Sequence, residues 1–160
     1  MTMKNRAFAL SKLLLSTTLV LTAINVGAED LDRLAGTYSA VSIPPFGDNP
    51  RGQLMLGSDG YYIVTLARAT LPKIVAGVRG NGTSEENKAI VAGSIAHWGR
   101  YTVDSKDKII TFYVEASTFA NWDGATFKRP YKISHDQFSY INNAPSGGGE
   151  SNEVVWKRLK

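Results

Sequence analysis

The chain contains no cysteine, and this absence excludes several classes of protein at once. Without thiols there is no disulfide framework, no thiolate metal ligand and no site for a bacterial lipid anchor, which is attached through cysteine. Histidine is scarce too, because only His97 and His135 occur, and two separated histidines without cysteine are a poor zinc signal. The sequence therefore predicts no metal site and no cofactor.

The sequence also lacks the motifs of common catalytic and nucleotide-binding sites. It has no Gly-x-Ser-x-Gly elbow, no phosphate-binding loop and no dinucleotide fingerprint. Residues 29–160 also have nearly equal numbers of basic and acidic residues. The chain has 18 basic and 14 acidic residues, and three of the basic ones (Lys4, Arg6 and Lys12) lie within residues 1–28, leaving 15 against 14. A near-neutral domain is a poor candidate for nucleic-acid binding, where phosphate contacts dominate affinity.

Residues 1–28 resemble a secretory signal peptide. The basic start is followed by the apolar run Leu13–Val26, and Val26-Gly27-Ala28 offers the small residues that signal peptidase requires. About 14 apolar residues fall short of the roughly 20 that span a bilayer, so cleavage after Ala28 is favoured over a membrane anchor. We expect residues 29–160 to form one domain that is periplasmic or secreted and has no membrane span after cleavage.

Most of residues 29–160 show the two-residue alternation of β-strands, broken by turn residues. Because successive side chains of a strand point to opposite faces, each run has one apolar face. Eight strands in sequential order predict a closed antiparallel up-and-down β-barrel, with a β-sandwich as the alternative. The expected strands are 34–43, 52–56, 61–66, 95–104, 108–116, 127–133, 138–142 and 152–159.

One segment between the third and fourth strands departs from this alternation. Thr83-Ser84-Glu85-Glu86 has the spacing of a helix capping box, and Asn87–Ala92 continues with good helix formers before Gly93. The pattern predicts one short helix. Such a helix could plug an open end of the barrel or act as a lid over a pocket.

Several motifs, taken in order, resemble the bacterial and fungal lipocalin-like domain family. That resemblance implies a small antiparallel β-barrel around an apolar cavity, and a family of mixed function with some members suspected of binding or cyclisation in natural-product pathways. It supplies no catalytic motif, and Tyr38 stands where tryptophan is common. The motifs are Gly36-Thr37-Tyr38, Pro50-Arg51-Gly52-Gln53-Leu54, Ser58-Asp59-Gly60-Tyr61, Gly99-Arg100-Tyr101-Thr102-Val103-Asp104, Glu115-Ala116-Ser117, Asn121-Trp122-Asp123-Gly124, Arg129 and Val155-Trp156-Lys157-Arg158.

The inward-facing positions are mainly aromatic. A cavity lined this way suits a hydrophobic, partly polar small molecule, although an eight-stranded barrel can also be packed solid. The expected inward residues are Tyr38, Leu54, Leu56, Tyr62, Val64, His97, Tyr101, Phe112, Val114, Phe127, Arg129, Tyr131, Phe138, Tyr140, Trp156 and Arg158. Of these, the predicted ligand-binding residues are Arg129, His97, Tyr101, Tyr131, Phe112, Phe138, Tyr140 and Trp156.

Arg129 is the central residue of this prediction. It shares a strand face with Phe127, Tyr131 and Ile133, where a guanidinium must be paired or hydrogen-bonded. Tyrosine hydroxyls or backbone carbonyls could accept its hydrogen bonds, and the alternative partner is an anionic or polarised oxygen of a ligand. For Arg158 the expected role is structural, namely a cation–π contact with Tyr38 that closes one end of the barrel.

Three functional hypotheses follow. The first is an exported carrier, not an enzyme, that binds a small hydrophobic molecule with an acidic or carbonyl group held by Arg129. The second is an isomerase or cyclase acting on a polyketide-like substrate, with His97 moving a proton and Arg129 stabilising an enolate-like oxygen. The third is an envelope or stress protein with a solid barrel that acts through its surface. We expect a monomer or weak dimer.

Overall fold

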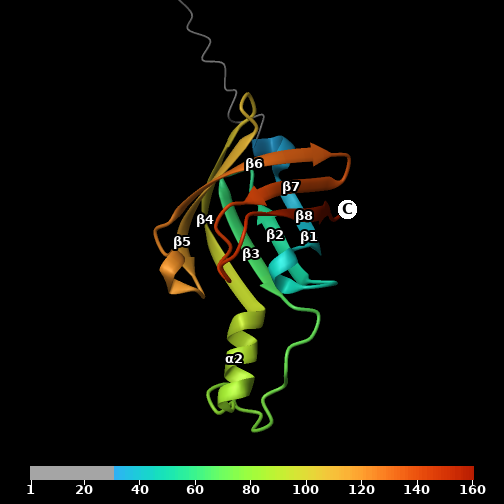
Figure 1. The fold of residues 1–160 in the computed structure, drawn as a ribbon. Coiled ribbons are helices and arrows are strands. Elements are labelled where there is room, and N and C mark those ends of the chain that lie inside the picture. Colours follow the sequence, from blue (N-terminus) through green and yellow to red (C-terminus); the bar gives the residue numbers. More distant parts are fainter. Residues whose placement is uncertain (1–30) are drawn as a thin grey trace, which may run out of the picture.

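The computed structural model describes residues 31–160, which form one barrel with a helical extension at one end (Figure 1). The predicted signal peptide lies outside the described residues. The strands are β1 (Gly36–Ser42), β2 (Arg51–Leu56), β3 (Tyr61–Ala67), β4 (Ser94–Asp104), β5 (Ile109–Ser117), β6 (Thr126–Ser134), β7 (Gln137–Asn142) and β8 (Asn152–Arg158). Residues 31–34 are helical, and the further helices of the described chain are η1 (Pro44–Phe46), α2 (Ser84–Gly93) and η2 (Ala120–Trp122).

The eight strands form a closed barrel in sequence order. Each strand pairs antiparallel with the next, and β1 closes the sheet by pairing with β8, with Tyr38 opposite Arg158. Closure leaves no free sheet edge, which removes the usual route to edge-to-edge aggregation. The prediction of an up-and-down barrel is confirmed, and the sandwich alternative is wrong.

Alternation along the strands separates the interior from the surface. In β3, Tyr62, Val64 and Leu66 are buried while the residues between them are exposed. The innermost side chains include Trp156 and Phe138, each with an exposed fraction of 0%. The core is therefore an aromatic one, held by tilted and edge-on ring contacts such as that between Tyr38 and Phe138.

A β-bulge in β5, where Glu115 is the extra residue opposite Trp98 and Gly99, shows why glycine occupies position 99. The register with β5 shifts between Trp98 and Gly99, and Gly99 has a φ of +157°. A Cβ atom at this position would lie 2.1 Å from the backbone oxygen of Tyr113. Because no real side chain tolerates that distance, the bulge requires glycine.

Residues next to β1 and β8 close one end of the barrel. The Arg158 guanidinium lies 4.7 Å from the ring centroid of Tyr38 and donates hydrogen bonds to the carbonyl oxygens of Ala35 and Arg33. The Tyr38 hydroxyl in turn donates to the carbonyl oxygen of Leu34 at 2.6 Å. These contacts fasten the segment that precedes β1 across the barrel, so the open end is the opposite one.

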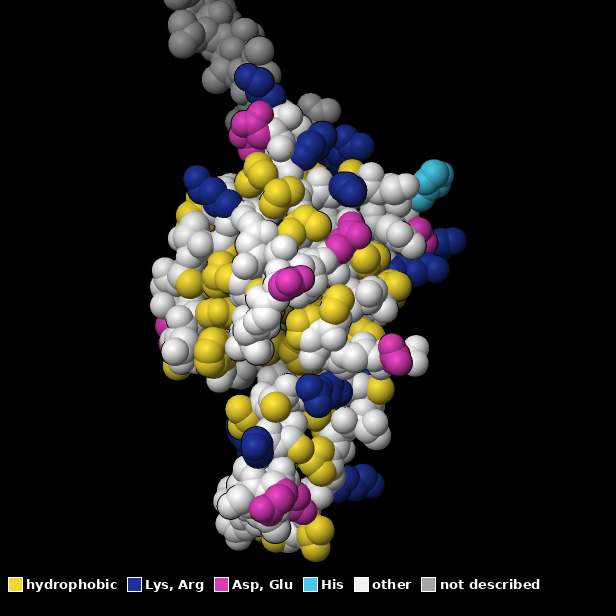
Figure 2. All heavy atoms as spheres, in the orientation of Figure 1, with side chains coloured by type: hydrophobic (Ala, Val, Ile, Leu, Met, Phe, Trp, Pro, Cys, Tyr) yellow, Lys and Arg dark blue, Asp and Glu magenta, His cyan; other side chains and the backbone are white. Residues whose placement is uncertain are grey.

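Helix α2 extends away from that open end. Thr83 is its N-cap, and the capping box with Glu86 is formed in both directions. Of the helix residues, only Gly93 is buried. Figures 1 and 2 show the helix and the preceding loop as a lobe beyond the barrel. The helix prediction is correct, but α2 does not plug the barrel. No helix within residues 31–160 is long and apolar enough to cross a membrane.

Candidate functional site

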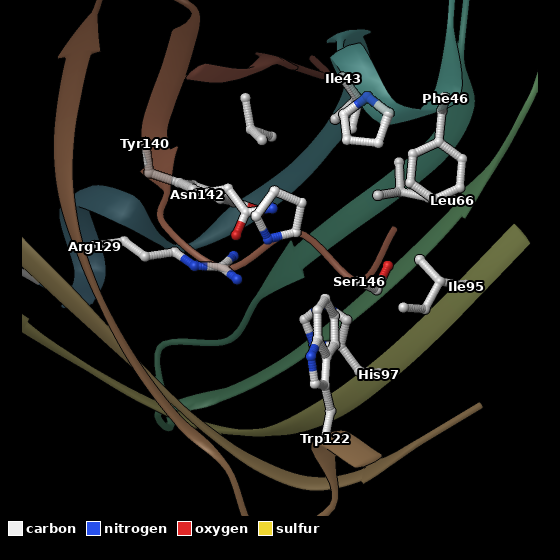
Figure 3. Close-up of a pocket in the computed structure, with 13 residues that line it drawn as sticks. Ile43, Phe46, Leu66, Ile95, His97, Trp122, Arg129, Tyr140, Asn142 and Ser146 are labelled. Carbon is white, nitrogen blue, oxygen red and sulfur yellow. The ribbon is translucent and has the colours of Figure 1, made fainter. Parts of the chain in front are cut away.

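The open end of the barrel contains a small pocket in which Arg129, His97 and Tyr140 meet (Figure 3). Strand β6 supplies Arg129, strand β4 supplies His97, and strand β7 supplies Tyr140. Further strand residues, together with loop and helix residues, complete the lining. The other lining residues are Ile43, Pro45, Phe46, Leu66, Ile95, Trp122, Asn142, Pro145, Ser146 and Val154.

This inner pocket has a volume of about 30 Å³. A buried water needs about 10–15 Å³ measured in this way, so the space fits one or two waters or a group of similar size. The barrel interior is thus largely filled by its own aromatic side chains. Of the two possibilities left open by the sequence, a cavity and a solid core, the space beside Arg129 is closer to the second, because the ring of Phe112 on β5 contacts that of Tyr140 on β7.

A much larger hollow lies directly outside the inner pocket. Its volume is about 920 Å³, and it is bounded by α2, η1, the end of β3 and the β7–β8 loop. The two spaces adjoin each other, because both are lined by Pro45, Phe46, Leu66, Ile95 and Ser146. The outer hollow is large enough for a drug-sized molecule, for which 300–1,000 Å³ is typical.

The charges along both spaces have one sign. Arg129 lies in the inner pocket, and Arg68 and Arg79 line the outer hollow. No aspartate or glutamate belongs to the lining of either space as the structure describes it. The path from the surface to the barrel interior therefore attracts anions and repels cations.

Arg129 is buried without a charged partner. Its exposed fraction is 3%, and its Nη2 atom has no hydrogen-bond partner within residues 31–160. The guanidinium lies over three aromatic rings, 4.9 Å from Phe127, 4.9 Å from Tyr140 and 5.5 Å from Phe112. Cation–π contacts stabilise it by roughly 0.5–2 kcal/mol each, which is less than the cost of burying an unpaired ion. Glu115 does not pair with Arg129, because Glu115 is exposed and forms an ion pair with Arg100.

His97 lines the same pocket and forms a hydrogen bond with Tyr62. The Tyr62 hydroxyl and His97 Nδ1 are 3.0 Å apart, and His97 is buried. Burial lowers the pKa of His97 to about 3, with the positive charge of Arg129 as a second cause. Burial also raises the pKa of Tyr62, so both groups are neutral at physiological pH. A neutral Nδ1 that accepts from Tyr62 leaves Nε2 as a donor.

Trp122 completes this side of the pocket from η2. Its ring lies edge-on to His97 at 5.4 Å and to Phe127 at 5.1 Å between centroids. Figure 3 shows the Arg129 guanidinium pointing into the space between Asn142 and the His97–Trp122 pair. The result is an aromatic pocket with hydrogen-bond donors directed inward, which suits a small group rich in acceptor oxygens.

The structure places only part of the predicted ligand-binding set around one space. Arg129, His97 and Tyr140 line the inner pocket. The others are buried in the core without lining it: Tyr101, Tyr131, Phe112, Phe138 and Trp156. Phe112 still contacts Arg129 through its ring, whereas the Tyr101 hydroxyl donates to the carbonyl oxygen of Gly57, away from the pocket.

The lining residues absent from the expected inward set include four on strands, Leu66, Ile95, Asn142 and Val154, and several in turns. Pro45 and Phe46 follow β1 in η1, Trp122 belongs to η2, and Pro145 and Ser146 lie in the β7–β8 loop. The only sequence signal was apolar or aromatic residues inside segments that otherwise read as turns. Within the described residues, no group of three or more metal-ligating side chains occurs.

Comparison with known proteins assigns a domain type. A family model described as a lipocalin-like domain matches residues 35–159, which is nearly all of the described chain. No curated protein matches the sequence.

Proposed function

The chain belongs to the lipocalin-like domain family, and on that premise we propose that it is an exported carrier of a small hydrophobic molecule with an anionic head group. The observation that carries this proposal is Arg129, a buried guanidinium with an unpartnered Nη2 at the end of a pocket whose lining contains no carboxylate. A carboxylate is the natural partner, because its two oxygens match the guanidinium fork.

The sizes of the two spaces support one mode of binding for such a molecule. The inner pocket of about 30 Å³ takes a carboxylate in place of one or two waters, but not a hydrocarbon chain. The hydrophobic part must then occupy the outer hollow, against side chains such as Phe46, Leu66 and Ile95. The ligand enters head first, and Arg68 and Arg79 attract its charge at the entrance.

The chemistry of His97 favours a carrier over the isomerase or cyclase alternative. A general base works best when its pKa lies near the working pH. With its pKa lowered to about 3, His97 accepts protons poorly at neutral pH. Its role in the carrier is to donate from Nε2 to the ligand head group while Tyr62 fixes the orientation of the ring.

A displacement assay tests this function. The neutral fluorescent probe N-phenyl-1-naphthylamine is bound first, and decanoate and decan-1-ol then compete for its place. These competitors share one chain and differ in the head group. We expect decanoate to displace the probe at a concentration at least about tenfold lower, as one charge-assisted pair in a buried site is worth more than 1.4 kcal/mol.

Two variants locate the effect. Arg129→Met should make the two competitors equivalent, whereas Lys132→Met, which removes an exposed cation from the same strand, should leave the preference for decanoate intact. If the unmodified protein binds decanol as well as decanoate, Arg129 is not an anion anchor. If the probe does not bind at all, the solid-barrel alternative is favoured.

Export is tested separately by N-terminal sequencing of the protein recovered from the periplasm or medium, with Glu29 as the expected first residue.

A further inference from the structure

The outer wall of the barrel carries a patch of hydrophobic side chains that ligand binding does not use. It consists of Met55, Tyr61, Ile63, Trp98 and Tyr113, called the outer patch below. Their exposed fractions are 45%, 44%, 39%, 43% and 43% in that order. All five lie at outward positions of four consecutive strands, β2 to β5.

Strand register makes these side chains contiguous. Met55 pairs with Ile63, and Ile63 pairs with Trp98, so one row crosses three strands. The next row is Tyr61, Arg100 and Tyr113. Directly opposed side chains on one face lie about 5 Å apart, so both rows form continuous surfaces.

The outer patch has the size of the largest apolar patch on a typical monomer, about 300–600 Å², and such patches are often functional. A covered aromatic side chain buries about 150–250 Å², so five side chains that are two-fifths exposed present on the order of 400 Å². A standard interface needs about 800 Å² from each partner, of which the apolar centre is the greater part. The flanking polar residues of the same strands supply the remainder.

Charges on this wall point to a second copy of the chain as the partner. The exposed charged residues of β2 to β5 are Arg51, Arg100, Asp104 and Glu115, two of each sign. Arg100 lies 4.3 Å over the Tyr61 ring, and its Nε is 3.7 Å from a Glu115 carboxylate oxygen. A face with no net charge, and with both members of an ion pair beside its apolar centre, is complementary to itself.

We propose that the protein forms a two-fold symmetric dimer through the outer patch. In such an isologous interface each residue of one copy meets its counterpart region on the other. Trp98 and Ile63 pack against the same residues of the second copy, and Arg100 of each copy faces Glu115 of the other. The open end of each barrel stays free, because Trp98 points outward while its neighbour His97 points into the pocket.

Sedimentation velocity over a hundredfold range of protein concentration tests the dimer. The unmodified protein should sediment with about twice the mass of a single copy at the higher concentrations. Ile63→Lys should weaken association by at least about tenfold, because it places a charge at the centre of the interface. Val41→Lys is the matched control: Val41 is also β-branched and 44% exposed, but it lies on β1 outside the outer patch.

Charge reversal separates self-association from binding to some other protein. Arg100→Glu alone should abolish the dimer, since it places like charges opposite each other across the two-fold axis. Arg100→Glu combined with Glu115→Arg should restore it. A monomeric unmodified protein at all concentrations overturns the proposal. So does equal behaviour of Ile63→Lys and Val41→Lys, or a double reversal that fails to restore the dimer while circular dichroism shows an intact barrel.

Discussion

Replacing Arg129 by methionine should stabilise the protein while removing its preference for anionic ligands. Most substitutions in a core destabilise, so the sign of this effect is diagnostic. Arg129 is 3% exposed and has an unpartnered Nη2, which means that folding strips water from a charge and returns no counter-ion. Methionine has a similar length and no charge.

The magnitude follows from the contacts that are exchanged. The variant loses cation–π contacts with Phe112, Phe127 and Tyr140, worth roughly 0.5–2 kcal/mol each. A thioether recovers part of this by sulfur–aromatic contact, about 0.3–1.5 kcal/mol per ring. Replacing buried ionic groups by apolar ones of similar volume is neutral or stabilising by about 1–4 kcal/mol. We expect a net gain of about 1–2 kcal/mol in the free energy of unfolding.

Urea denaturation followed by tryptophan fluorescence at pH 7 measures this gain. Arg129→Lys is the control, because it keeps the buried charge and should show no stabilisation. A second readout is the pKa of His97 by NMR titration, which should rise in Arg129→Met because the guanidinium charge is one cause of its lowering. A methionine variant that is destabilised by more than about 1 kcal/mol would show that the guanidinium is satisfied in the free protein, and the reasoning fails.

Three further predictions concern the fold around the site. Stability should fall by about 2 kcal/mol between pH 7 and pH 5, because unfolded His97 binds a proton below pH 6.5 whereas folded His97, with its pKa near 3, does not. Urea titrations at both pH values should show this slope reduced in His97→Asn but not in the exposed His135→Asn. Gly99→Ala should cost about 3 kcal/mol by chemical denaturation, since its Cβ would meet the Tyr113 backbone. Arg158→Ala should cost about 2 kcal/mol, and hydrogen exchange should localise the loosening to the amides of β1, with β5 unchanged.

The strands could be derived from the sequence because each strand of a barrel has its own local pattern of alternating side chains. Each strand that faces a core on one side must alternate, and residues 61–67 or 127–133 show this without knowledge of their partners. The helix could be found for a similar reason, since the capping box of Thr83 and Glu86 is local. Order in sequence then became order in the barrel, because short turns join only neighbouring strands.

The candidate site also has a part that the sequence predicts and a part that it does not. Alternation places Arg129 and His97 inside the barrel, but it does not tell which end they occupy or how much room is left beside them. Phe46, Trp122 and Ser146 reach the pocket from turns, whose side-chain directions obey no period. The sequence also did not determine that α2 points away from the barrel, because the loop before it has no periodic pattern.

The sequence by itself determined the barrel, its inward residues and the buried cation on β6, because these depend on local periodicity and on the chemistry of single side chains. Only the tertiary structure decided that the interior is nearly filled, that the free volume lies outside the open end, and that no carboxylate reaches Arg129. Volume and charge pairing depend on distances between strands far apart in the chain. No local pattern encodes those distances.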